Sequence, residues 1–313
     1  MSSTIHKEDS VEREEAATKV SPLPPKKSSF APITDETVDA WLSLTFKSYD
    51  GITRLMERGH FGQLIIQKPF YLDRENHGVC HVIIVHPPGG VCGGDELRFS
   101  SDVGAAGKVQ VTTPGATKWY KANGNISRQE VTLNVETGAT LEWLPQEAIF
   151  FDGAHVQLNN EITLAKDATF IGCEILCFGR TRSGENFDSG QITQRTRIHR
   201  EGKPIWFEQL QLKGGGSAMK SPLMLAGYTV CATLVVVSGE AVSSELIDSM
   251  REEASEIADG VGELGVTQLK SVVVVRYLGD SSEVARRIML QVWGILRPTL
   301  VGHEASVPRM WTT

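Results

Sequence analysis

A strand, a tight turn and a second strand are encoded in the run Leu97-Arg98-Phe99-Ser100-Ser101-Asp102-Val103-Gly104-Ala105-Ala106-Gly107-Lys108-Val109-Gln110-Val111. Apolar and polar residues alternate on both sides of the Gly-Ala-Ala-Gly segment, and this period of two is typical of strands that bury one face. Glycine tolerates the backbone angles of tight turns that other residues avoid. We therefore expect two strands joined by a turn at 104–107.

The same strand-turn-strand pattern occurs four times along the chain. The other three turns are expected at 137–139, 166–168 and 201–203, so that the turns recur at intervals of about 30 to 35 residues. Regular spacing of this kind favours stacked strand pairs, as in a β-helix or an elongated sandwich. We predict a mainly β fold with β-helix-like stacked strands.

The C-terminal third has a different pattern. Apolar residues fall on one helical face over 242–257 and again over 284–296, where Pro298 is expected to stop the helix. A β-branched strand over 272–277 lies between them. We expect a small α+β part at 221–313, containing two helices, after a β body that ends at about residue 220.

The first 30 residues combine many charges with prolines and serines. Such a composition cannot bury enough apolar surface to offset the entropy of ordering the chain. We expect a disordered tail at 1–30 and a folded domain over 31–313.

Composition excludes several classes of protein. The chain has 313 residues, is 41% hydrophobic and carries a net charge of −7, which argues against a nucleic-acid surface. The longest uncharged run, 221–239, contains Pro222 and ends in a β-branched cluster, so we expect strands there and no membrane span. Five cysteines and an N-terminus without a basic segment followed by an apolar run favour a cytoplasmic location.

A second notable segment is His86-Pro87-Pro88-Gly89-Gly90-Val91-Cys92-Gly93-Gly94-Asp95. Its glycines could cradle a phosphate, but the Lys-Ser/Thr pair of a P-loop is missing. Side chains that could bind nickel, zinc or copper lie in and before this loop, although their spacing is not that of a zinc finger. They are Cys80, His81, His86 and Cys92.

Several acidic residues stand among apolar strand residues, namely Glu142, Glu147, Asp152, Glu174 and Glu208. Each could point outward to water, or together they could line a polar interior passage. No recognisable nucleophile motif occurs. One alternative is nevertheless an enzyme that acts on a sugar or polyanion in a β-helical cleft, with Glu142, Glu147 or Asp152 as acid and base.

Longer motifs give the chain a family resemblance. From about Gly62 to its last residues the sequence resembles the urease accessory protein UreD family, called UreH in some bacteria. The segments that carry the resemblance are His86–Asp95, Thr112-Thr113-Pro114-Gly115-Ala116-Thr117-Lys118, Leu141-Glu142-Trp143-Leu144-Pro145-Gln146-Glu147, Phe151-Asp152-Gly153-Ala154, Gly179-Arg180, Ser183-Gly184-Glu185, Leu296-Arg297-Pro298 and Pro308-Arg309-Met310-Trp311.

The resemblance implies a non-enzymatic scaffold, a metallocentre-assembly chaperone that binds UreF, the GTPase UreG and the urease apoprotein. It implies a β-helical fold with two helices and a water-filled tunnel through which nickel passes, with no permanently bound cofactor. The tunnel residues it implies are Asp95, Thr117, Glu174 and Glu208, with His86, Cys92, Glu142 and Asp152 as weaker candidates. A pure interaction scaffold that never contacts nickel is a further alternative.

Overall fold

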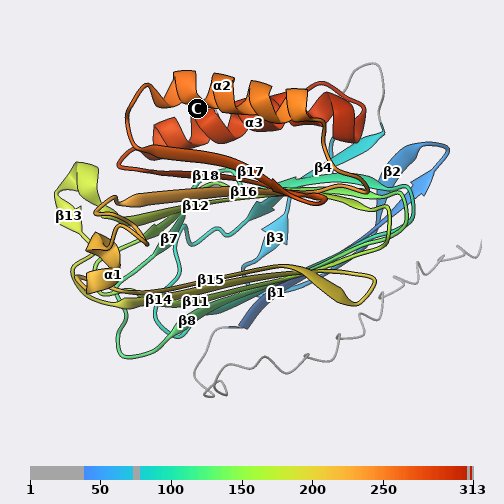
Figure 1. Ribbon diagram of the computed structural model, residues 1–313. Coiled ribbons are helices and arrows are strands. Elements are labelled where there is room, and N and C mark those ends of the chain that lie inside the picture. Colours follow the sequence, from blue (N-terminus) through green and yellow to red (C-terminus); the bar gives the residue numbers. More distant parts are fainter. Residues whose placement is uncertain (1–38, 73–77, 309–310, 312–313) are drawn as a thin grey trace, which may run out of the picture. The chain divides into compact units, whose positions relative to one another are not determined.

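The computed structural model of the protein describes residues 39–72, 78–308 and 311. In this part of the chain, two β-sheets and one layer of helices lie on top of one another (Figure 1). The predicted mainly β, β-helix-like class is confirmed. The predicted tail at 1–30 lies outside the described residues.

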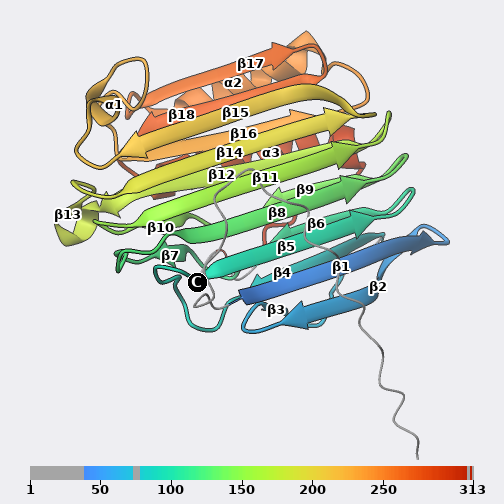
Figure 2. The same ribbon diagram turned by 90° about the horizontal axis from the view of Figure 1, so that it is seen from below.

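The first sheet is mostly parallel (Figure 2). Only its two edge strands run antiparallel to their neighbours. From edge to edge its strands are β15 (Lys203–Lys213), β14 (Gln191–Arg200), β11 (His155–Leu164), β8 (Ser127–Val135), β5 (Glu96–Val103), β1 (Asp39–Tyr49) and β2 (Ile52–Phe61).

The second sheet lies between the first sheet and the helices (Figure 1). Its main path consists of β17 (Glu263–Leu269), β18 (Val272–Gly279), β16 (Val230–Val237), β12 (Thr169–Arg180), β9 (Thr140–Leu144), β6 (Lys108–Thr112), β4 (Val79–Val85) and β3 (Ile65–Ile66). Three short strands, β7 (Thr117–Trp119), β10 (Ala148–Phe150) and β13 (Glu185–Asn186), pair beside this path.

Three of the four predicted turns carry the chain from the first sheet to the second. They join β5 to β6, β8 to β9 and β11 to β12, so each coil contributes one strand to each sheet. The fourth turn is a hairpin inside the first sheet, because β14 and β15 pair antiparallel. Glu201 and Gly202 both have positive φ there, as a two-residue hairpin turn of type I′ requires.

The return connections, from the second sheet to the first, stack on one another. Val91 in the glycine-rich loop bridges to Trp119, and β7, β10 and β12 continue this parallel stack. The buried rings of Trp119, Phe150 and Phe178 follow one another along it. The glycine-rich loop is thus the first of a series of return connections.

Both predicted helices are present, and a four-residue helix, α1 (Ser217–Lys220), is additional. The second predicted helix, α3 (Ser282–Val301), runs through Pro298, so the prediction that this proline stops it was wrong. Its last turn buries Val301, and the helix ends where Gly302 takes a positive φ and its N–H bonds to the Pro298 carbonyl. The packing of Val301 thus offsets the cost of a proline inside the helix. The other helix is α2 (Ser244–Ala258), and a short 3-10 helix, η1 (Thr181–Ser183), precedes β13.

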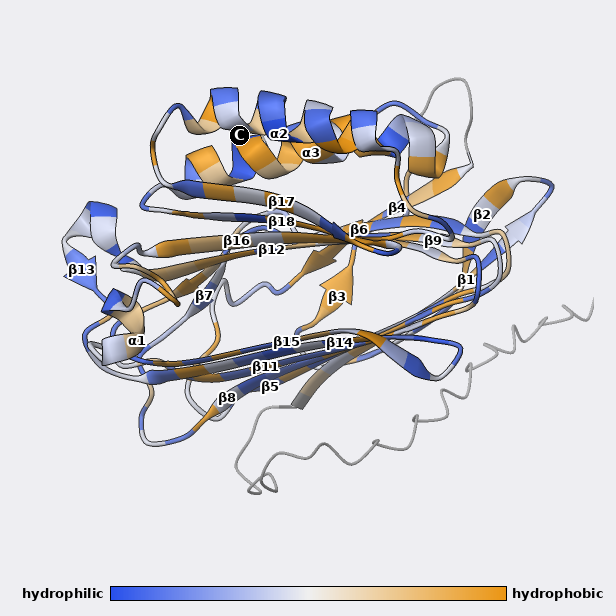
Figure 3. Cartoon of the chain, in the orientation of Figure 1, coloured by the Kyte–Doolittle hydropathy of each residue, from blue (hydrophilic) through white to orange (hydrophobic). Residues whose placement is uncertain are grey.

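Two apolar cores follow from this layering. One fills the space between the sheets, and the other lies between the second sheet and the inner sides of α2 and α3. In Figure 3 the visible side of α2 is largely hydrophilic, whereas α3 carries hydrophobic residues next to the sheet.

The run 221–239 contains β16, as predicted, and none of the described helices is long and apolar enough to cross a membrane. The boundary near residue 220 stays a prediction.

Candidate functional site

A polar cluster interrupts the apolar core between the two sheets. The inward-facing residues of β11 are Val156, Leu158, Asn160, Ile162 and Leu164, all of them buried and all but Asn160 apolar. In β14 the inward positions 194 and 196 hold buried Gln194 and Thr196. A polar side chain in such an apolar row requires a hydrogen-bond partner, here from across the space between the two sheets.

Glu174 of β12 is that partner, and it reaches across from the second sheet. Asn160 donates from Nδ2 to its Oε1 over 2.9 Å, and Gln194 donates from Nε2 to its Oε2 over 2.8 Å. Both amides also donate to the hydroxyl of Thr196. One carboxylate therefore joins two strands of the opposite sheet.

Glu208 and Arg276 form a second polar connection between the sheets. Glu208 lies on the edge strand β15, and its Oε1 accepts a hydrogen bond from Nη2 of Arg276 on β18. The side chain of Arg276 is 42% exposed and that of Glu208 is 20% exposed. This ion pair lies toward solvent, whereas the Glu174 carboxylate is enclosed by Asn160 and Gln194.

The electrostatics of Glu174 are unusual. Burial raises the pKa of Glu174 to about 7, and the nearby charge of Glu208 adds to the rise, while Asn160, Gln194 and Arg276 counteract it. Cys231 of β16 faces the same space, and burial raises the pKa of its thiol to about 11. At neutral pH, the charged and the neutral form of the Glu174 carboxyl are thus both populated.

Thr117 is placed on the same side of the second sheet as Glu174. It is in register with Ala148, and Ala148 with Leu176, which lies two residues beyond Glu174 on β12. Neighbours in register have their side chains on one face, and alternate residues of a strand share a face. Thr117 therefore faces the space between the sheets, two strands away from Glu174.

Asp95 lies apart from this cluster, at the end of the first sheet where the parallel strands begin. Its Oδ2 accepts a hydrogen bond from the Cys92 N–H over 2.8 Å, which closes the glycine-rich loop. Val131 of β8 is in register with both Asn160 of β11 and Phe99 of β5, and Phe99 comes after Asp95 in the chain. Asn160 is therefore two strands away from Asp95 and further along the sheet. Desolvation lowers the pKa of His86, opposed by the charge of Asp95.

Close packing explains two of the four glycines of this loop, Gly90 and Gly93. A Cβ on Gly90 would overlap the ring of Tyr120, and one on Gly93 would meet the side chain of Asn123. Both partners belong to the next return connection. The glycines thus allow two neighbouring connections to lie directly against each other.

Glu142 points away from the space between the sheets. It is fully buried against α3, where it accepts hydrogen bonds from Trp293 Nε1 over 2.6 Å and from Arg297 Nε over 3.1 Å. Arg297 also contacts the carbonyl of Glu304 and is fully buried. This ion pair joins the second sheet to α3.

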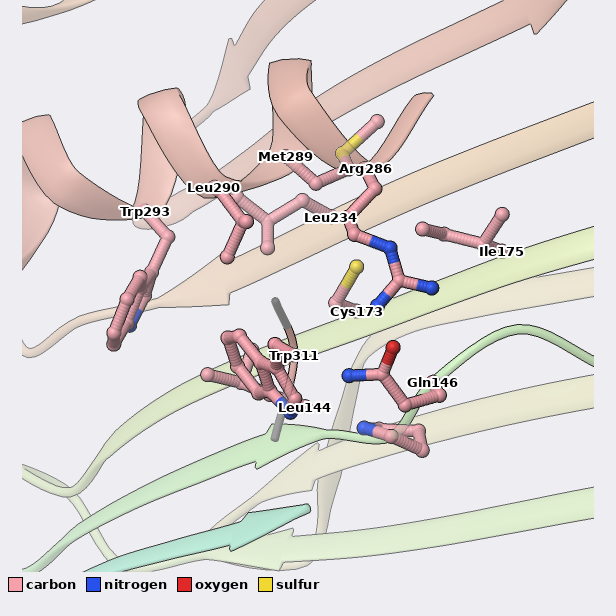
Figure 4. Close-up of a pocket in the computed structure, with 11 residues that line it drawn as sticks. Leu144, Gln146, Cys173, Ile175, Leu234, Arg286, Met289, Leu290, Trp293 and Trp311 are labelled. Carbon is pink, nitrogen blue, oxygen red and sulfur yellow. The ribbon is translucent and has the colours of Figure 1, made fainter. Parts of the chain in front are cut away.

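The two other acids proposed for a cleft enzyme are also engaged. Glu147 pairs with Arg286 of α3, and Asp152 Oδ1 accepts hydrogen bonds from the N–H and Oγ of Ser189. Beside Arg286 is a cavity of only about 30 Å³, which Leu144, Cys173 and Trp293 help to line (Figure 4). A larger hollow of about 590 Å³ lies near the start of α2. Neither is lined by Glu142, Glu147 or Asp152.

Within the described ranges, no three His, Cys, Asp or Glu side chains come together to hold a metal ion. The cysteines Cys173 and Cys177 are free and buried, as small apolar residues are. Sequence reasoning missed Asn160, Gln194, Thr196 and Arg276. The first three could have been noticed as polar residues at inward positions of alternating strands.

Comparison with known proteins gives a consistent picture. A family model described as "UreD urease accessory protein" matches residues 38–312. A urease accessory protein UreD of Nitrosospira multiformis is 51% identical over 280 residues, which cover 90% of this chain and 99% of that protein. One from Janthinobacterium sp. is 54% identical over 274 residues, covering 88% of this chain and 91% of that protein. One from Nitrosococcus oceani is 40% identical over 290 residues, covering 93% of this chain and 94% of that protein.

Proposed function

Since the chain belongs to the UreD family of urease accessory proteins and so acts in urease maturation, we propose that it is a non-catalytic chaperone for nickel insertion. In this proposal it binds UreF, the GTPase UreG and the urease apoprotein in the cytoplasm. Nickel is its cargo in transit, and no cofactor stays bound.

The observation that carries the proposal is the polar cluster around Glu174 in an otherwise apolar core. Burying a carboxylate inside a core costs free energy even when neutral amides donate hydrogen bonds to it, unless an opposite charge or water is also near. Carboxylate, hydroxyl and amide oxygens bind nickel more weakly than thiolates and imidazoles do, so a nickel ion that meets them is released again. This chemistry fits transfer better than storage.

Two further polar atoms support an interior that contains water. Oγ of Ser101 and Nε1 of Trp119 are buried in the space between the sheets and have no hydrogen-bond partner among the described residues. Buried polar groups of this kind are normally satisfied by ordered water. We propose that water and nickel share a polar tunnel between the sheets.

The route we propose runs past Asp95, Thr117, Glu174 and Glu208. Thr117 and Glu174 share one face of the second sheet, and Glu208 lies beside Glu174. Asp95 would lie at one end, beside the glycine-rich loop. His86, Cys92 and Asp152 lie outside the strands, in connecting loops, and Glu142 faces the helices.

Co-expression tests the proposal. Urease, UreF and UreG would be produced with this chain at limiting nickel, and urease activity and urease-bound nickel would be measured. We expect Glu174→Gln with Glu208→Gln to reduce both at least tenfold while the complex still co-purifies. Glu161→Gln is the control, because Glu161 pairs with Arg197 on the outer face of the first sheet.

Two results would contradict the proposal in different ways. Full activation without the chain would exclude a role in nickel insertion. Full activation by the double variant would exclude the route and leave an interaction scaffold that never contacts nickel. An enzymatic role would require turnover by the isolated chain that is abolished by Glu147→Gln.

A further inference from the structure

Arg276 lies on the side of the polar cluster that is nearest to solvent. It belongs to β18, which is one strand from the edge of the second sheet, and its partner Glu208 lies on the edge strand of the first sheet. Its charge also acts on Glu174 and on Cys231. The Arg276 guanidinium thus supplies positive charge to both carboxylates, Glu174 and Glu208.

Arg276 is held more loosely than Arg297, the arginine that pairs with Glu142 on the helix side of the second sheet. Arg297 is fully buried, contacts both carboxylate oxygens of Glu142 and lies over the Trp293 ring. For Arg276, Nε is buried but finds no hydrogen-bond partner within the described part of the chain. Among the described residues, Glu208 alone engages the guanidinium, through Nη2, and the side chain of Arg276 is 42% exposed. Such a side chain can leave its carboxylate and reach water.

A divalent cation and this guanidinium would compete for the same carboxylates. Two carboxylates and one arginine leave the group with one net negative charge when both acids are ionised. A cation that enters beside Glu208 nevertheless meets the positive charge of Arg276, and two like charges a few ångströms apart repel each other strongly. The cation and the guanidinium therefore cannot occupy the position beside Glu208 at the same time.

We propose that Arg276 is a tethered cation that occupies the position of the cargo beside Glu208, is displaced when a divalent metal ion enters, and drives the ion onward when it returns. This inference rests on the proposed function, because it concerns the same route. It assigns Arg276 a positioning role in which the guanidinium keeps the two carboxylates from becoming a stable metal site. The structural requirement is only that one side chain changes rotamer.

The experiment compares three substitutions in the full chain, purified in complex with UreF. Arg276→Met removes the charge but keeps much of the length, Arg276→Lys keeps the charge, and Arg197→Met removes an arginine whose partner Glu161 lies on the outer face of the same sheet as Glu208. The measurements are Ni²⁺ retention by equilibrium dialysis, and the rate of urease activation after UreG and apoprotein are added.

We expect Arg276→Met to retain Ni²⁺ at least tenfold more tightly and to activate urease at least threefold more slowly. Arg276→Lys and Arg197→Met should behave like the wild type. Unchanged retention and activation in Arg276→Met would overturn the inference and leave the proposed route intact. If Glu174→Gln with Glu208→Gln activated urease as the wild type does, the route itself would be excluded, and the inference with it.

A second measurement needs no variant and applies even if Arg276→Met fails to fold. Phenylglyoxal modifies accessible arginines, and mass spectrometry of the wild-type complex reports the modified fraction of Arg276. We expect Ni²⁺ to increase the modification rate of Arg276 at least threefold and to leave that of Arg197 unchanged. A purely structural Arg276 would react at the same rate with and without Ni²⁺, and that result would overturn the inference.

Discussion

Asn160 donates a 2.9 Å hydrogen bond from Nδ2 to Oε1 of Glu174, across the space that separates the two sheets. Its own strand would otherwise present a continuous apolar row to the core. The bond fixes the carboxylate from one side while Gln194 fixes it from the other. Glu174 is thereby held between the sheets and kept from turning toward the edge.

Replacing Asn160 with leucine should destabilise the protein. Glu174 Oε1 would lose its donor inside the core, and leaving a buried acceptor unsatisfied costs about 1 to 3 kcal/mol. Asn134→Leu is the matched control, because Asn134 makes a similar 2.7 Å bond to Asp102 on the outer face of the same sheet. Urea titration of both variants gives the free energies of unfolding. Equal losses would mean that the bond to Glu174 has no special weight.

Stability should depend on pH through Glu174. Its pKa is about 7 in the folded protein, against an ordinary value of 4.5, so the folded state holds an extra proton between these values. The contribution of Glu174 to stability is then greatest below about pH 4.5 and is lost as the pH rises through about 7, by about 3 kcal/mol in total.

Glu174→Gln should remove this part of the pH dependence. The difference in unfolding free energy between the variant and the wild type should therefore shift in favour of the variant between pH 5 and pH 8. Denaturant titrations at both pH values measure it. A difference that stays constant over this range would show that Glu174 titrates near its ordinary pKa.

The ion pair of Glu142 and Arg297 should be important for stability, because neither side chain reaches solvent. Arg297→Met would leave a buried carboxylate without its counter-charge, which costs about 3 to 5 kcal/mol. Arg182→Met, which breaks an exposed pair with Glu283, should cost less than about 1 kcal/mol. Changing Glu142 to Leu in the Arg297→Met background should restore part of the loss. Thermal or urea unfolding of the four proteins tests both statements.

The repeat architecture could be predicted because local turn chemistry recurs at regular spacing. What the turns could not reveal is whether the next strand crosses to the other sheet or returns beside the previous one. The turn at 104–107 crosses, whereas Glu201 and Gly202 form a hairpin. Partners far away in the sequence decide between these outcomes. The same holds for Pro298, which is overridden by packing at the end of α3.

The site was only partly predictable for a similar reason. Glu174 and Glu208 were found as acids among apolar strand residues, but Arg276 lies in a β-branched strand and 68 residues from its partner Glu208. Asn160 and Gln194 carry no charge and belong to no motif. Their importance follows from two sheets facing each other, which alternation within one strand cannot reveal.

The glycine-rich loop offers a last test of how the return connections stack. Gly90→Ala would push a Cβ into the ring of Tyr120, which is itself held edge-on against Phe151. Overpacking of this kind costs about 1 to 3 kcal/mol, whereas Gly115→Ala, which meets open space, should change stability by less than about 0.5 kcal/mol. If the overlap is the cause, the loss should shrink when Tyr120 is changed to alanine in the same chain. Urea titrations of the single and double variants measure this coupling, and an equally large loss in both backgrounds would show that Gly90 acts through its own backbone.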